Sequence, residues 1–268
     1  MKNKIFLLVL LNLSLMSYGQ IKFNGNFESG YEDRLVGFYD STIKDLNPSS
    51  YFKNNLYGTL KLNSEFKGFS IYGINKISFF PYNIVNYNLE LNEYQLGARY
   101  TYKCFFIGYD HLRSYSIDAK YFSEAYDRFF LGTEFSNIPL SCKNFNVNGG
   151  MDLGYEDRYF KFYDIPQMDP YNITRSRYTF YSVFRLSGNI RKFSIYASNK
   201  TYFSPDNLFN YNPLLIEYIL GVKFEGDRFS FGWENMCTHA IEENYFRDGY
   251  DRVFLKIKLF DKKQTNSQ

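Results

Sequence analysis

The stretch EYQLGARYTY, from Glu93 to Tyr102, alternates between two kinds of residue. Its odd positions hold Glu, Gln, Gly, Arg and Thr, whereas its even positions hold Tyr, Leu, Ala, Tyr and Tyr. Successive side chains of a β-strand point to opposite faces, so this stretch would present one polar and one apolar face. The same period of two runs from Leu56 to Asn63, and helical periodicity is nowhere as strong. The sequence therefore predicts an all-β protein of amphipathic strands.

The opening stretch recurs as EYILGVKF, from Glu217 to Phe224, which is 124 positions further along. The same shift aligns Gly30 to Leu131 with Gly154 to Leu255 without a gap, and each aligned segment begins with the string GYEDR. A period this long is not that of a solenoid repeat. No linker rich in Pro, Gly or Ser separates the copies around residues 137–146, which favours one closed object over two domains.

Each copy is predicted to contain six strands. In the first copy they cover residues 22–33, 52–64, 69–79, 91–102, 104–112 and 126–136, and the second copy repeats them about 124 residues on. Long connections follow the first, third and fifth strands, and short ones follow the second and fourth. An even number of antiparallel strands of about ten residues with alternating long and short connections is typical of transmembrane β-barrels. We therefore predict a closed antiparallel transmembrane β-barrel of about twelve strands, built from two tandem six-strand repeats.

The first residues carry the features of a secretory signal peptide. Lys2 and Lys4 precede an apolar run from Ile5 to Met16, and the small residues Ser17 and Gly19 follow. We predict a signal peptide over residues 1–19 and a single barrel domain over 20–260. Within that domain, repeat one covers about 22–136 and repeat two about 146–260, and a polar tail covers 261–268. The apolar run is short for a membrane-spanning helix.

The composition excludes several classes of protein. Aromatic residues make up 21% of the chain although the mean hydropathy is −0.40, as expected for alternation in place of long apolar blocks. A net charge of +3 in an exported chain argues against binding to nucleic acid. Three cysteines are too few for a disulfide scaffold. Cys104 and Cys142 would pair only if they lie at the same end of neighbouring strands.

Alternation alone also fits a secreted soluble barrel or sandwich, because it does not say which face is inside. A barrel of twelve strands, however, is too wide for side chains to fill with a dry apolar core. Phe and Tyr lie near strand ends, and the last strand, GYDRVFLKIKLF, ends on Phe260. On these features the chain resembles Gram-negative outer-membrane β-barrel proteins, whose last strand commonly ends in an aromatic residue. The resemblance is architectural, covers the mature chain, and implies a location in the outer membrane with the lipid bilayer as partner.

If the apolar faces meet lipid, the polar faces line the lumen, because an Arg or Lys facing the middle of the bilayer costs about 2–4 kcal/mol. In the first copy these residues are Glu32, Arg34, Tyr57, Lys61, Tyr72, Lys76, Glu93, Arg99, Asp110 and Arg128. Their counterparts are Glu156, Arg158, Tyr181, Arg185, Tyr196, Lys200, Glu217, Lys223, Glu234 and Arg252. Bases outnumber acids, so we expect a mildly electropositive lumen. Several of these residues lie at predicted strand ends, which places a charged belt near the outer mouth.

This belt has two interpretations. As a constriction, a ring of basic side chains would select small anionic or zwitterionic solutes, and the protein would be a narrow passive channel. As a network of ion pairs, it would close and stiffen the barrel, because buried charges are normally paired. The protein would then be a sealed structural or interaction barrel whose outer loops, Pro81 to Asn88 and Pro205 to Asn212, bind a partner or glycan.

The sequence contains no catalytic or nucleotide-binding fingerprint. A lipid hydrolase remains a third alternative, in which His111 at the outer rim would act as base, with Ser114 and Ser116 nearby. Acidic residues in the predicted outer loops would suit calcium, although we interpret them as solvated charges and expect neither a metal nor a cofactor. They are Asp40, Asp45, Asp164, Asp169, Glu242 and Glu243.

Overall fold

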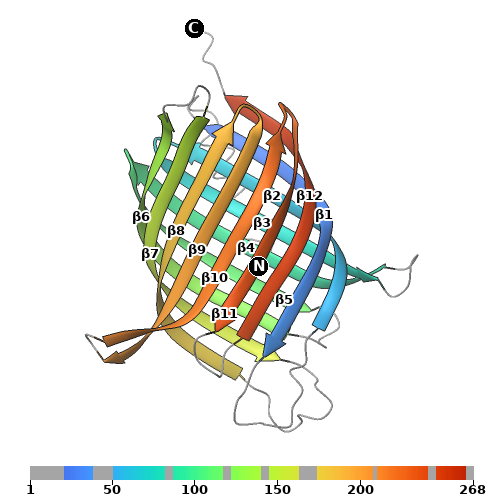
Figure 1. Cartoon of the computed structure of the whole chain (residues 1–268), viewed down its shortest axis with the longest axis vertical. Helices are drawn as coiled ribbons and strands as arrows, with labels where there is room; N and C mark the ends of the chain where they lie inside the picture. The colour runs from blue at the N-terminus through green and yellow to red at the C-terminus, as the bar shows by residue number, and fades with distance from the viewer. Residues whose placement is uncertain are drawn as a thin grey trace.

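The computed structural model is a closed barrel of twelve antiparallel strands (Figure 1). It describes residues 21–38, 51–81, 87–116, 122–139, 145–162, 174–207, 210–240 and 246–263. Each strand pairs with the next along the chain, and β12 pairs with β1 to close the sheet. The predicted fold class and the number of strands are therefore confirmed. Within the described residues, no helix has the length and apolar character needed to cross a membrane.

The strands follow one another without crossovers. They are β1 (Lys22–Phe38), β2 (Tyr51–Phe66), β3 (Phe69–Pro81), β4 (Tyr87–Tyr102), β5 (Phe105–Ser116), β6 (Phe122–Pro139), β7 (Phe145–Phe162), β8 (Thr174–Ile190), β9 (Phe193–Asn207), β10 (Asn210–Glu225), β11 (Phe229–Ala240) and β12 (Phe246–Lys263).

The strands are longer than the alternation predicted. β1 continues to Phe38 where an end at residue 33 was expected, and β12 continues to Lys263, three residues into the predicted tail. Backbone pairing requires only N–H and C=O groups, so the ladder extends beyond the point where side chains alternate. The connection after β1 is correspondingly shorter than expected.

The end of the barrel opposite the long connections has tight turns. Lys67 and Gly68 join β2 to β3 with φ angles of 46° and 82°, and Lys103 and Arg191 adopt φ angles of 56° and 53° in the turns after β4 and β8. Left-handed φ angles are those that two-residue hairpin turns require. The predicted short connections are thus confirmed here, and we call this the short-turn end. Cys104, in the β4–β5 turn, is an exposed free thiol, and Cys142 lies outside the described residues.

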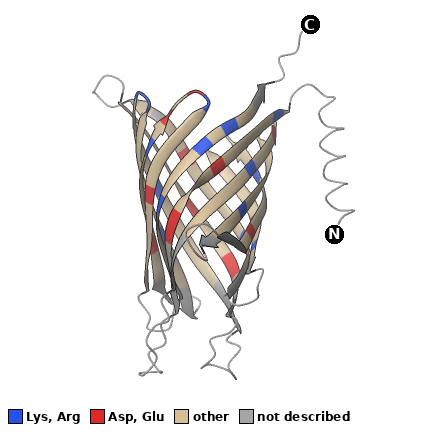
Figure 2. Cartoon of the chain, turned by 90° about the vertical axis from the view of Figure 1, so that its right-hand side faces the viewer, with Lys and Arg blue, Asp and Glu red and all other residues tan. Residues whose placement is uncertain are grey.

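The outer surface of the barrel is apolar and the inner surface is polar. Along β12, Val253 and Leu255 are 52% and 47% exposed, whereas the intervening Phe254 is 9% exposed. Most strands with described side chains repeat this pattern, and fully buried side chains include Glu32 and Glu156. A soluble barrel would show the opposite arrangement, because exposed apolar belts are not stable in water. The outer face therefore suits lipid. Figure 2 shows where charged residues lie along the strands of the barrel wall.

The polar interior as candidate functional site

Arg128 on β6 and Asp110 on β5 form a two-pronged ion pair near the middle of the barrel. The Nε and Nη2 atoms of Arg128 each lie 2.7 Å from a different carboxylate oxygen of Asp110. Tyr72 and Gln95 donate further hydrogen bonds to Asp110 Oδ2, both at 2.9 Å. Asp110 is only 1% exposed, and these four hydrogen bonds replace the water that it lost.

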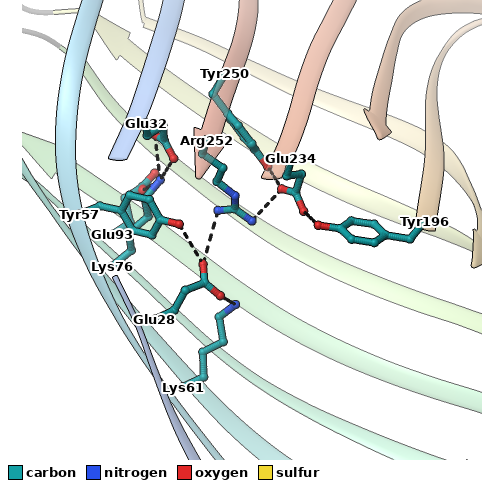
Figure 3. A network of polar contacts seen from close by, with 10 residues as sticks. All are labelled: Glu28, Glu32, Tyr57, Lys61, Lys76, Glu93, Tyr196, Glu234, Tyr250 and Arg252. Atoms are coloured by element: carbon teal, nitrogen blue, oxygen red, sulfur yellow. Dashed lines mark hydrogen bonds and ion pairs between the residues drawn. The ribbon is translucent and has the colours of Figure 1, made fainter. Parts of the chain in front are cut away.

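Arg252 and Glu234 repeat this arrangement 124 residues further on (Figure 3). Arg252 Nη2 lies 2.7 Å from Glu234 Oε1, and Tyr250 and Tyr196 donate hydrogen bonds to the two carboxylate oxygens at 2.6 and 2.7 Å. Arg252 has one additional contact, because its Nη1 atom lies 3.8 Å from Glu28 Oε1. The two clusters are alike in chemistry, but the second is linked to a further carboxylate.

Two lysines reach across an intervening strand to buried glutamates. Lys76 on β3 lies 2.8 Å from Glu32 on β1, and Lys200 on β9 lies 3.0 Å from Glu156 on β7. Side chains that bridge next-nearest strands must lie inside the curve of the barrel. The Lys76 ammonium also lies 5.0 Å from the centre of the Tyr57 ring, a favourable cation–π distance.

The other predicted lumen residues also make interior contacts. Lys61 pairs with Glu28 at 3.4 Å, Arg99 with Glu134 at 2.8 Å, and Lys223 with Glu225 at 2.6 Å. The remaining predicted residues contact one another or a neighbour: Glu93 with Lys76, Tyr181 with Lys200, Arg185 with Asp152, and Glu217 with Tyr202. The side chains of Arg34 and Arg158 lie outside the described residues.

The sequence prediction missed several interior acids, which include Glu28 and Asp152 as well as Glu134 and Glu225, the partners of Arg99 and Lys223. Glu28 accepts hydrogen bonds from Lys61 and Tyr57, and Asp152 pairs with Arg185. Glu28 and Asp152 lie 124 positions apart, two residues before the aligned segments begin, and on the same strand face as the predicted acids. They lie an even number of residues before the predicted acids Glu32 and Glu156, and this spacing was the signal that could have identified them. Their presence reduces the excess of bases that the sequence indicated.

The charged belt does not lie at the outer mouth, so that part of the prediction was wrong. Asp110 is in the middle of β5, and its neighbours in the same row are Arg128 on β6 and Glu156 on β7. Because backbone pairing continues well beyond these residues, what looked like strand ends in the sequence are strand centres. The belt therefore crosses the middle of the barrel.

Bases and acids differ in how far they reach into the interior. Arg128 is 21% exposed and Asp110 1%, and Lys76 is 16% exposed and Glu32 0%. The same order holds for Lys200 with Glu156, Arg252 with Glu234, Lys61 with Glu28 and Arg185 with Asp152. The acids lie against the wall and the bases lie over them. Nearer the short-turn end the order reverses in two pairs, Arg99 with Glu134 and Lys223 with Glu225.

Two glycines allow tyrosine rings to lie flat on the wall. A Cβ atom at Gly97 would lie 2.3 Å from the Tyr72 ring, and one at Gly221 would lie 2.2 Å from the Tyr196 ring. Any larger residue would push the ring away and disturb the hydrogen bonds to Asp110 and Glu234. This close approach is a structural reason for glycine at both positions.

Comparison with known proteins identifies a fold. No family model and no curated protein matches the chain. Among solved structures, it is similar to an outer-membrane channel from Pseudomonas putida F1, with a TM-score of 0.51, 7% identity and coverage of 88% of this chain and 95% of the other. The chain has the fold of outer-membrane β-barrels. The NanC porin (TM-score 0.45, 11% identity, coverage 85% and 100%) and the translocator domain of the autotransporter NalP from Neisseria meningitidis (0.40, 10%, 88% and 88%) are also similar.

The structure separates the residues considered for lipid hydrolysis. His111 lies on the outer face, where its Nδ1 atom is 3.0 Å from Asp127 Oδ1, whereas Ser114 is fully buried on the inner face. Residues three apart in a strand point to opposite faces, so His111 cannot activate Ser114. The Ser116 side chain lies outside the described residues, as do all six acids considered for calcium. Among the described residues, no group of three His, Cys, Asp or Glu side chains could hold a metal ion.

Proposed function

We propose that the protein is a narrow passive channel of the outer membrane for small polar solutes, with a preference for anions. The observation that carries the proposal is the arrangement of the mid-barrel ion pairs. Their acids are buried against the wall and hydrogen-bonded, and their bases are the groups that a passing solute would meet. A nearly neutral network can therefore present a positive surface to the lumen, and basic side chains lining a pore lower the barrier for anions.

The interior also explains why such a channel would be narrow. Tyr57, Tyr181 and Tyr202 are 1–2% exposed and fill space beside the ion pairs. By contrast, the side chains of Lys61 and Arg185 are 37% and 43% exposed, so solvent reaches the interior on the short-turn side of the belt. The same packed tyrosines support the second candidate, a barrel sealed by its network that acts through its outer surface.

Single-channel recording in planar bilayers separates the two candidates. We expect discrete openings with an anion-selective reversal potential from the wild-type protein. The double variant Arg128→Gln and Arg252→Gln should shift selectivity towards cations, because Asp110 and Glu234 lose their covering charges. Arg113→Gln removes the same charge from the outward face of β5 and should leave selectivity unchanged. Correctly folded protein without openings would overturn the channel proposal in favour of the sealed barrel.

A further inference from the structure

The inner face of five adjacent strands carries a row of lysines near the short-turn end. Lys223 on β10, Lys256 and Lys258 on β12, and Lys61 on β2 form this row, which we call the lysine wall. Lys256 lies opposite Glu28 on β1, and Lys258 and Lys61 lie opposite Asn26 from either side. Directly opposed residues share a face of the sheet, so all of these side chains point inward.

The lysine wall holds more positive than negative charge. The charge of Lys256 is close enough to interact with those of Lys61 and Lys223, which repel it, and with those of Glu28 and Glu225. Glu28 is 7% exposed and is shared with Tyr57 and Arg252, and Glu225 pairs with Lys223 at 2.6 Å. With Lys22 and Glu65, which pair at 3.8 Å on the same face of β1 and β2, five lysines face three carboxylates among the described residues of this wall. Such an excess is repulsive in the empty protein, and a bound anion would relieve it.

The opposite side of the barrel shows that this excess is specific to one wall. The equivalent positions 124 residues away form the matched wall, on β4 to β8. It has Arg99 for Lys223, Arg185 for Lys61, Gly132 for Lys256, Glu134 for Lys258 and Asp152 for Glu28. There the two bases are balanced by two acids, in the ion pairs Arg99–Glu134 and Arg185–Asp152.

The two walls also differ in their aromatic side chains. On the matched wall, Phe106 is 5% exposed, and its ring lies 2.5 Å from where a Cβ of Gly132 would be. The Arg99 guanidinium covers that ring at 3.8 Å from its centre. On the lysine wall, Ser230 replaces Phe106, opposite Lys256. Lys256 stands where the matched wall has Gly132, so the lysine wall carries an ammonium-bearing chain in place of the phenyl ring.

We propose that the lysine wall is a binding subsite for extended oxyanions that carry two or more negative charges, entered from the short-turn end. Lysines on alternate strands are about 10 Å apart along the wall, too far for one compact ion to contact all of them but suitable for a chain of charged groups. Ammonium groups bind phosphate or carboxylate as point charges without demanding a fixed geometry. This inference rests on the proposed channel function, because it specifies the class of solute that the channel would admit.

Calorimetric titration of the folded full-length protein in detergent with tripolyphosphate tests the subsite directly. We expect saturable binding that weakens about tenfold or more in the double variant Lys223→Gln and Lys256→Gln. The matched double variant Arg99→Gln and Arg185→Gln removes two charges from the opposite wall and should bind within about twofold of wild type. Equal losses in both double variants, or no binding by the wild type, would overturn the subsite.

Bilayer recording separates failure of the subsite from failure of the channel. Tripolyphosphate added on the short-turn side should block openings at lower concentration than on the loop side, and the lysine variant should lose this difference. Orthophosphate, which spans only one lysine position, should block more weakly than tripolyphosphate. Openings without any block would contradict the subsite and leave the channel standing, whereas calorimetric binding without openings would contradict the channel alone.

Discussion

The lysine wall lies on β10, β12 and β2, and the matched wall lies at equivalent positions on β4 to β8. The two walls differ in particular side chains. At the level of the belt the two sides are nearly the same, since Arg128 with Asp110 corresponds to Arg252 with Glu234. Towards the short-turn end they diverge, with Phe106 and Glu134 on one side and Ser230 and Lys258 on the other. The belt residues depend on one another for hydrogen bonds and are alike. The residues nearer the short-turn end differ between the walls, and we propose that solutes are distinguished there.

The largest difference should appear when the buried acid of each belt cluster is neutralised. Asp110→Asn leaves the Arg128 charge buried without its ion pair, and losing one partner of such a pair costs about 3–5 kcal/mol of unfolding free energy. Glu234→Gln should cost less, because Arg252 also lies 3.8 Å from Glu28. Urea unfolding of the two variants in lipid vesicles, followed by tryptophan fluorescence, measures both.

A third variant makes this comparison sharper. Glu28→Gln combined with Glu234→Gln removes the two carboxylates that lie 3.8 and 2.7 Å from Arg252 and should bring the loss up to that of Asp110→Asn. If Glu234→Gln alone is already as destabilising as Asp110→Asn, the contact between Arg252 and Glu28 contributes nothing.

A second, smaller effect should be equal on the two sides. Gly97→Ala and Gly221→Ala place a methyl group against the rings of Tyr72 and Tyr196, at 2.3 and 2.2 Å, and each should cost about 1–3 kcal/mol of unfolding free energy through overpacking. Gly58→Ala is the matched control, because its Cβ would lie an ordinary 3.5 Å from Phe27. Unequal losses for Gly97 and Gly221 would show that the two tyrosines are not held alike.

Exchanging one residue between the walls should alter selectivity with little change in stability. Glu134→Lys gives the matched wall the residue of the lysine wall, and Lys258→Glu does the reverse. The pair Arg99–Glu134 is partly exposed, so its loss should cost less than about 1 kcal/mol. Reversal potentials should move towards anions for Glu134→Lys and towards cations for Lys258→Glu. Shifts of the same sign would contradict the assignment of both residues to the interior.

The smallest effect should come from salt. Screening lengths fall from about 10 Å at 0.1 M to about 3 Å at 1 M. Anion selectivity of the wild type should therefore weaken as ionic strength rises. The double variant Lys223→Gln and Lys256→Gln should show a weaker salt dependence, because it has less charge to screen. Selectivity that does not depend on salt would indicate sieving by size.

The fold could be predicted from the sequence because side-chain alternation reports directly on strand faces. Glu93 to Tyr102 already separates an inner from an outer face, and six alternating segments in each of the two aligned copies predict twelve strands. The ends of the strands could not be predicted in this way. Residues 34–38 of β1 pair through backbone groups, and backbone pairing leaves no trace in side-chain chemistry.

The sequence could indicate which candidate residues share a strand face, but not which of them are in contact. The alternation of side chains placed Lys76 and Glu32 on the same face of the sheet. Their pairing across β2, however, depends on the shear and curvature of the closed sheet. Side-chain alternation also could not reveal that the acids lie closer to the barrel wall than the bases. That order depends on side-chain length and on tyrosine donors such as Tyr72. The role of these residues in selecting a solute stays a prediction until it is measured.

The pairing of β12 with β1 has a consequence for assembly. Until the last strand is made, β1 has one edge without a partner, and Arg252 can meet only Glu234 within its own hairpin. The contact of 3.8 Å between Arg252 and Glu28 forms only when the two ends of the chain meet. A long backbone ladder spans this seam, and the ion contact between Arg252 and Glu28 forms only in the complete cylinder.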